Sequence, residues 1–115
     1  MKRALTIVAV TVLAGAAGAP AAGAATYRAC KPVKNPYAGT RYDGIDLSRI
    51  RALRTSCHGA RHVAKGAHRK ALGLTPPASG IRRFTWRGWS VTGDLRPSSD
   101  RYVARKGRRR VRWRF

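Results

Sequence analysis

The last fifteen residues, 101–115, alternate basic and apolar side chains with a period of two. Successive side chains of a β-strand point to opposite faces, so this period predicts two strands joined by a tight turn at Lys106–Gly107. With that turn, Tyr102 lies opposite Val111 and Ala104 lies opposite Arg109. One face of the hairpin is then apolar and comprises Tyr102, Ala104, Val111, Trp113 and Phe115. The other face carries Arg101, Arg105, Arg108, Arg110, Arg112 and Arg114. The chain must therefore fold around a sheet that is buried on one face and strongly basic on the other.

Residues 57–72 have the period of an amphipathic helix. Ser56 precedes them as an N-cap, and the apolar residues that recur every three or four positions are Ala60, Val63, Ala64, Ala67 and Ala71. Gly73 stands where a left-handed C-cap is expected, and Pro76–Pro77 prevents the helix from continuing. The apolar stripe is mostly alanine, so we expect aromatic residues of the sheet to fill the core beneath it.

The rest of the chain indicates an α+β fold. Residues 80–92 also alternate with a period of two, with a break near Gly88. Residues 46–53 are ambiguous: Asp46 would cap a short helix, whereas Ile50 and Ala52 alternate with arginines as in a half-buried strand, which is favoured. Residues 26–45 contain prolines, glycines and tyrosines and predict a turn-rich arm. We therefore predict a domain over residues 46–115 in which one helix packs on a three- or four-stranded antiparallel sheet.

Residues 1–25 have the layout of a secretory signal peptide. A cationic Met1-Lys2-Arg3 precedes an apolar run, and the small residues that follow predict cleavage after Ala24 or Ala25. An uncleaved membrane anchor is the alternative. Removing Lys2 and Arg3 from the 25 basic residues leaves 23, and with 4 acidic residues the mature charge is +19. We expect this charge to act outside the cell or in the cell envelope.

The two cysteines, Cys30 and Cys57, predict a disulfide in an exported chain. It would close a loop of 28 residues and stabilise the fold by about 3.5 kcal/mol through the unfolded state. The alternative is a nucleophilic Cys57 beside His58 at a helix N-terminus.

Three sequence motifs carry a resemblance. They are I-x-A-x-x-x-S-C-x-x-A-R-x-V-A from Ile50, F-x-W-x-G-W-x-V from Phe84, and Y-V-A-R-x-G-x-x-x-V-R-W-x-F from Tyr102. The pattern resembles a group of small secreted actinobacterial proteins of unknown function and covers residues 50–115. The resemblance implies a helix that opens on a cysteine, a Gly-aromatic strand, a closing hairpin and export, but it implies no activity.

Composition argues against an enzyme. The acidic residues are Asp43, Asp46, Asp94 and Asp100, with no glutamate, so paired carboxylates for acid–base chemistry are scarce. His58 and His62 are spaced to share one helix face, but neighbouring Arg61 and Lys65 would repel a cation. We therefore predict no catalytic residue, no metal and no cofactor.

The basic C-terminal segment suggests a binding role. Of the 25 basic residues 19 are arginine, whose guanidinium binds phosphate, sulfate or carboxylate through two hydrogen bonds. We expect the polyanion-binding residues to be Arg105, Lys106, Arg108, Arg109, Arg110, Arg112 and Arg114. The partners would be anionic polymers of the cell envelope, nucleic acid or an anionic membrane surface. The alternatives are a membrane-active antimicrobial-type protein, if Trp113 and Phe115 are free to insert, and a structural envelope protein whose charge only solubilises it.

Overall fold

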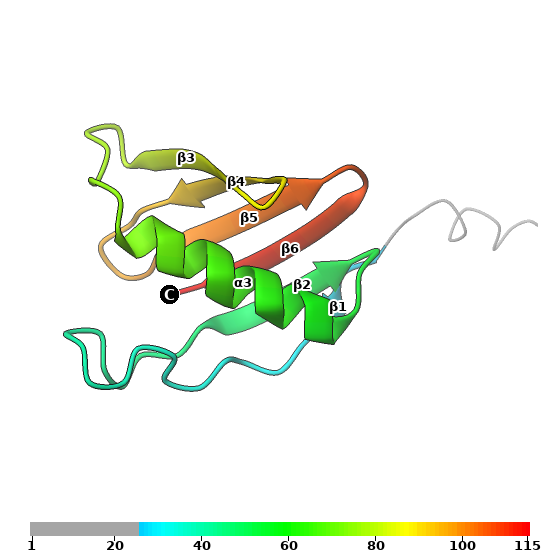
Figure 1. The fold of residues 1–115 in the computed structure, drawn as a ribbon, viewed down its shortest axis with the longest axis horizontal. Helices are drawn as coiled ribbons and strands as arrows, with labels where there is room; N and C mark the ends of the chain where they lie inside the picture. Colours follow the sequence, from blue (N-terminus) through cyan, green and yellow to red (C-terminus); the bar gives the residue numbers. More distant parts are fainter. Residues whose placement is uncertain (1–25) are drawn as a thin grey trace, which may run out of the picture.

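The computed structural model describes residues 26–115, which form an antiparallel sheet with one helix across one of its faces (Figure 1). The strands are β1 (Arg28–Ala29), β2 (Ser48–Leu53), β3 (Ile81–Trp86), β4 (Trp89–Asp94), β5 (Arg101–Lys106) and β6 (Arg109–Arg114), and the helix is α3 (Cys57–Leu72). Across the sheet the order is β1-β2-β6-β5-β4-β3. The predicted signal segment, with its cleavage sites at Ala24 and Ala25, lies outside the described residues.

The predicted α+β class is confirmed, but three or four strands was too few, because the sheet has six. The break near Gly88 is a hairpin turn that separates β3 from β4. Arg87 and Gly88 have positive φ angles of 45° and 83°, as both central residues of a type I′ turn require. Residues 48–53 form a strand, as favoured, and the arm adds β1 at the edge of the sheet by pairing Arg28 with Ala52.

The β5–β6 hairpin turns one residue later than predicted. Gly107 and Arg108 form the turn, and Gly107 has a positive φ of 61°, which suits the first position of a type II′ turn. Tyr102 therefore lies opposite Trp113, not Val111, and Ala104 lies opposite Val111, not Arg109. This register differs from the predicted one by two residues, so the strand side chains keep the faces that the alternation predicted.

The helix α3 has the predicted bounds. The Ser56 hydroxyl accepts a hydrogen bond of 3.0 Å from the Gly59 N–H, as an N-cap does. The predicted left-handed conformation of Gly73 is wrong, because its φ is −89°. The last carbonyls of the helix are satisfied by local N–H groups: Gly73 donates to Lys70 O at 3.0 Å and Leu74 donates to Ala71 O at 3.1 Å. The Arg82 guanidinium, reaching from β3, adds hydrogen bonds to Ala71 O at 2.7 Å and to Leu74 O, beyond the helix, at 3.3 Å.

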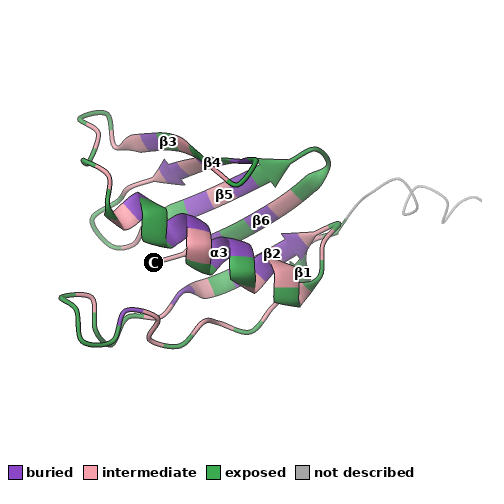
Figure 2. Cartoon of the chain, in the orientation of Figure 1, coloured by how far each residue is buried: buried purple, intermediate pink, exposed green. Residues whose placement is uncertain are grey.

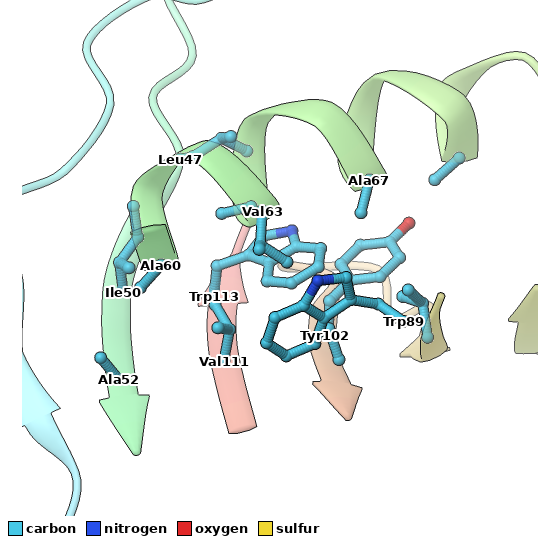
Figure 3. Packing of buried hydrophobic residues seen from close by; sticks show 14 residues of the cluster. Leu47, Ile50, Ala52, Ala60, Val63, Ala67, Trp89, Tyr102, Val111 and Trp113 are labelled. Atoms are coloured by element: carbon cyan, nitrogen blue, oxygen red, sulfur yellow. The ribbon is translucent and has the colours of Figure 1, made fainter. Parts of the chain in front are cut away.

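Aromatic residues of the sheet fill the core beneath the alanine stripe, as predicted (Figure 3). Figure 2 shows buried positions on α3 and on the strands that it crosses. Trp113 and Tyr102 stack with their ring centroids 5.3 Å apart and their planes within 6°, and each is 1 % exposed. Val63 and Ala67 of α3 point down onto these rings in Figure 3. The small alanine side chains let the helix approach the sheet closely, while the rings supply the apolar area.

The disulfide between Cys30 and Cys57 is confirmed and joins the arm to the first residue of α3, with a Cα–Cα distance of 5.4 Å. The Cys30 N–H also donates to Ile50 O at 2.8 Å, so the arm follows the edge of β2. Farther along the arm, Val33 forms an isolated antiparallel β-bridge with Leu47, the residue just before β2. The arm is thus mostly irregular, as expected, yet it is attached along its length.

A buried pair of polar side chains attaches the far end of the arm to α3. The Tyr37 hydroxyl lies 2.6 Å from His68 Nδ1, and His68 is fully buried between the rings of Tyr102 and Phe115. Burial, together with the positive charge of Arg82, lowers the pKa of His68 to about 3. Burial likewise raises the pKa of Tyr37 to about 12. Both groups are therefore neutral in the folded protein at neutral pH.

We predict that His68 makes the protein lose stability in mild acid. The imidazole takes up a proton near pH 6.5 in the unfolded chain but only near pH 3 in the folded protein. The free energy of unfolding should therefore fall by about 1.4 kcal/mol per pH unit as the pH drops from about 6 to 4. Urea unfolding at several pH values measures this slope. The single variant Tyr37→Phe should keep it, whereas Tyr37→Phe with His68→Phe should lose it; equal slopes in the two variants would contradict the assignment.

Candidate anion-binding surface

The sheet face turned away from α3 carries arginines from three adjacent strands. Directly opposite residues of antiparallel strands point to the same side, and the face that holds Ile50, Tyr102 and Trp113 is the one covered by α3. The remaining strand positions face outward. We call the following set the arginine face: Arg49 and Arg51 of β2, Arg101 and Arg105 of β5, and Arg110, Arg112 and Arg114 of β6.

Like charges lie directly opposite each other at three points on the arginine face. The pairs are Arg51 with Arg112, Arg101 with Arg114, and Arg105 with Arg110. Such pairs destabilise a sheet, by up to about 1 kcal/mol each where the charges are poorly screened. Three such pairs on one face lower the stability of the fold, so the requirements of folding do not explain their presence.

An open concavity of about 390 Å³ lies within this face. The residues that line it are Arg49, Arg51, Arg101, Tyr102, Val103, Arg112, Trp113 and Arg114. Five of the lining residues are arginines, and none of the others is acidic. At its edge the Arg112 guanidinium lies 4.0 Å from the centre of the Tyr27 ring, a cation–π contact that holds this side chain while its N–H groups remain available.

A β-bulge places Arg49 beside the concavity. The register between β2 and β6 shifts between Ser48 and Arg51, and Arg49 has a positive φ of 50°. A bulge inserts one extra residue and bends the strand, so it redirects a side chain that regular pairing would have turned elsewhere. A non-glycine residue in the left-handed region is unusual, and here it adds a fifth arginine to the rim.

Arg114 experiences the positive charges of its neighbours on this face. The pKa of Arg114 is lowered, first by partial desolvation and then by the positive charges of Arg101, Arg49, Arg51 and Arg96. A lowered pKa for a guanidinium means that the surroundings disfavour its charge. An anion placed among these side chains would reverse that effect.

The four carboxylates are engaged elsewhere. Asp43 accepts a hydrogen bond from Asn35 Nδ2 at 2.9 Å, and Asp46 accepts one from the Asn35 N–H at 2.8 Å, both within the arm. Asp94 borders the arginine face, directly opposite Arg101, but its carboxylate binds Arg96 at 2.8 Å. The backbone N–H of Arg96 also donates to the Asp100 carboxylate at 3.2 Å.

The structure divides the predicted polyanion-binding set. Arg105, Arg110, Arg112 and Arg114 lie on the arginine face. Arg108, predicted to share it, is instead in the hairpin turn, because the turn lies one residue later. Lys106 and Arg109 pair with each other and belong to the other side of the hairpin, as the period of two requires.

The contacts of Arg110, and the presence of Arg49 and Arg51 on this face, do not follow from the sequence of the hairpin alone. The Arg110 guanidinium donates to Gly107 O at 2.7 Å and to Arg109 O at 2.9 Å, so it is partly used in the turn. Arg49 and Arg51 were missed because they reach the face only through the pairing of β2 with β6, between segments far apart in the chain. The sequence did hold a signal for them: both arginines alternate with the apolar Ile50 and Ala52, as expected for a strand with one buried face.

The other candidate groups do not come together. Both cysteines are in the disulfide, so Cys57 is not the free thiol that the nucleophile alternative requires. His58 and His62 are exposed on α3, and within residues 26–115 there is no group of three or more potential metal-ligating side chains. In the same part of the chain, no helix has the length and apolarity needed to cross a membrane.

Comparison with models of known families, with curated proteins and with solved structures finds no match to this chain.

We predict that relieving one like-charge pair raises stability. Arg105 lies opposite Arg110 on one side and Ser90 on the other, so Arg105→Thr removes repulsion without breaking an ion pair. The free energy of unfolding should rise by about 0.5 kcal/mol at low salt, and the gain should shrink as salt screens the charges.

The matched control is Arg83→Thr, because Arg83 is exposed on a strand but lies opposite Thr92. Urea unfolding at two salt concentrations measures both variants. A gain that is the same for both, or that does not change with salt, would contradict the repulsion.

Proposed function

We propose that the protein is a secreted, non-catalytic binder of anionic polymers and that the arginine face is its binding surface. The observation that carries the proposal is the set of three directly opposed arginine pairs, two of which line a concavity that has no carboxylate among its lining residues. A purely solubilising surface intersperses positive and negative charges. This face instead places positive charges at directly opposite positions of neighbouring strands, where like charges destabilise a sheet.

The chemistry of the face suits repeated phosphate, sulfate or carboxylate groups. Guanidinium groups bind such oxyanions through two parallel hydrogen bonds, and they are weakly hydrated compared with ammonium groups. Alternate residues of one strand are about 6.7 Å apart and neighbouring strands about 4.8 Å apart, so β2, β6 and β5 present a regular grid of charges. A chain of anionic groups would meet several arginines at once.

Secretion is supported by the disulfide as well as by the predicted signal segment. Disulfides persist in oxidising compartments, and the Cys30–Cys57 bond joins the arm to the body of the fold. A catalytic role finds little support because each of the four aspartates is engaged in local hydrogen bonds or ion pairs.

The packing of the C-terminal aromatics counts against the membrane-active alternative. Trp113 is buried against Tyr102 beneath α3, and Phe115 packs on His68 with a ring-centroid distance of 4.3 Å. Side chains that form the core would have to leave it before they could insert into lipid. The purely solubilising alternative makes a different prediction in solution, namely weak binding that no particular arginine controls.

The test is a salt series with the mature protein and three probes: a duplex DNA of about 12 base pairs, a sulfated glycan and anionic vesicles. Contact of five arginines with phosphates should give a slope of log K against log salt of about −4 to −5 on the duplex. Substituting Arg101, Arg112 and Arg114 together with glutamine should reduce the slope to about −2.

A charge-matched control replaces three exposed cations outside this face, Lys31, Arg41 and Arg54, with glutamine. It should keep most of the slope and the affinity. A flat slope, or the same loss in both triple variants, would overturn the proposal. Vesicle binding that survives high salt would instead favour the membrane-active alternative, because hydrophobic insertion is not screened.

A further inference from the structure

A second group of cations lies between α3 and the β3–β4 turn. A concavity of about 350 Å³ is lined there by His62, Lys65, Gly66, Arg69, Trp86 and Arg87. None of these residues is acidic. Within residues 26–115 the ion pairs are Lys34 with Asp46 and Arg96 with Asp94, so the cations of this concavity are not neutralised by a carboxylate. We call Lys65, Arg69 and Arg87 the helix-side cluster.

The helix supplies one wall of the concavity. His62, Lys65 and Arg69 are separated by three and four residues and therefore share one side of α3. All three are exposed, whereas Val63, Ala64 and Ala67 of the same turns are buried against the sheet. The exposed row therefore points away from the core.

The β3–β4 turn supplies the opposite wall. The Arg87 guanidinium lies 5.1 Å from the centre of the Trp86 ring, a cation–π contact that orients it. A Cβ atom on Gly66 would overlap the Trp86 ring, so a glycine at this point of the helix is what lets the ring lie against α3. Trp86 is only partly buried, in contrast to Trp89 and Trp113, which belong to the core. The turn and the helix thus hold an aromatic ring and three cations together.

The helix-side cluster and the arginine face are on opposite layers of the protein. The cluster lies between α3 and the β3–β4 turn, on the side of the sheet that α3 covers, whereas the arginine face is on the other side of the sheet; Figure 1 shows α3 across one sheet face. Duplex DNA stays straight over lengths far below its persistence length of about 150 base pairs. A duplex of about 12 base pairs seated on one surface therefore cannot bend around the molecule to reach the other.

We propose that the helix-side cluster is a second polyanion contact and that one molecule bridges two anionic polymer strands. This inference rests on the proposed function of the arginine face. Each surface binds one strand through its own unpaired cations, so the protein acts as a crosslinker of anionic polymers in addition to binding them.

The experiment mixes donor-labelled and acceptor-labelled duplexes of about 12 base pairs with less than one protein per duplex and measures energy transfer. The protein alone is checked for the monomeric state by sedimentation. Native protein should bring donor and acceptor together at low salt and release them as salt rises. Binding of a single labelled duplex is measured in parallel by anisotropy.

Three charge-matched variants separate the surfaces. Glutamine at Lys65, Arg69 and Arg87 should lower energy transfer about tenfold while anisotropy still reports binding of one duplex. Glutamine at Arg101, Arg112 and Arg114 should lower both signals, and glutamine at Lys31, Arg41 and Arg54 should lower neither by more than about twofold. Circular dichroism confirms that each variant is folded.

The outcomes distinguish the two proposals. Salt-steep binding by the native protein without energy transfer would overturn the bridging inference and leave the arginine face intact. Energy transfer that persists in the helix-side variant would overturn it as well, because bridging would then not need this cluster. No binding of a single duplex by the native protein would overturn both for this probe.

Discussion

The stacking of Tyr102 on Trp113 beneath α3 determines where the charge of this protein lies. Once these two rings are buried, the period of two leaves the neighbouring arginines no position except the opposite face of the sheet. The alanine stripe of α3 accommodates the rings, and β2 and β4 extend the same apolar layer to either side. The alternation of apolar and basic side chains along the strands thus produces both the core and the candidate binding surface.

This arrangement concentrates repulsion on a small domain, and other contacts offset it. The disulfide restricts the unfolded chain, and the arm adds β1, the Val33–Leu47 bridge and the buried contact between Tyr37 and His68. The Arg82 guanidinium donates to Ala71 O, near the end of α3, from inside the fold. None of these contacts uses a guanidinium group of the arginine face, so those groups stay free to bind an anion.

Local patterns predicted most of the fold, and contacts between distant segments account for the errors. The bounds of α3, the faces of β5 and β6 and the disulfide follow from period, capping and cysteine number. The predicted left-handed cap at Gly73 is wrong: Gly73 stays right-handed and its N–H donates to Lys70 O, while the remote Arg82 guanidinium adds a hydrogen bond to Ala71 O. The turn was misplaced by one residue because a period of two is equally compatible with either position. Arg49 and Arg51 join the surface only through β2–β6 pairing and a bulge, which no local pattern specifies.

The most direct test of the central claim is to map where a polyanion touches the protein. Arginine Nε–Hε signals can be followed by nuclear magnetic resonance while a short anionic oligomer is added at low salt. We predict that the largest shifts fall on Arg49, Arg51, Arg101, Arg112 and Arg114, around the concavity of the arginine face. Shifts spread evenly over all exposed basic residues, including Arg41 and Arg54, would contradict it and show that the surface has no special affinity for anions.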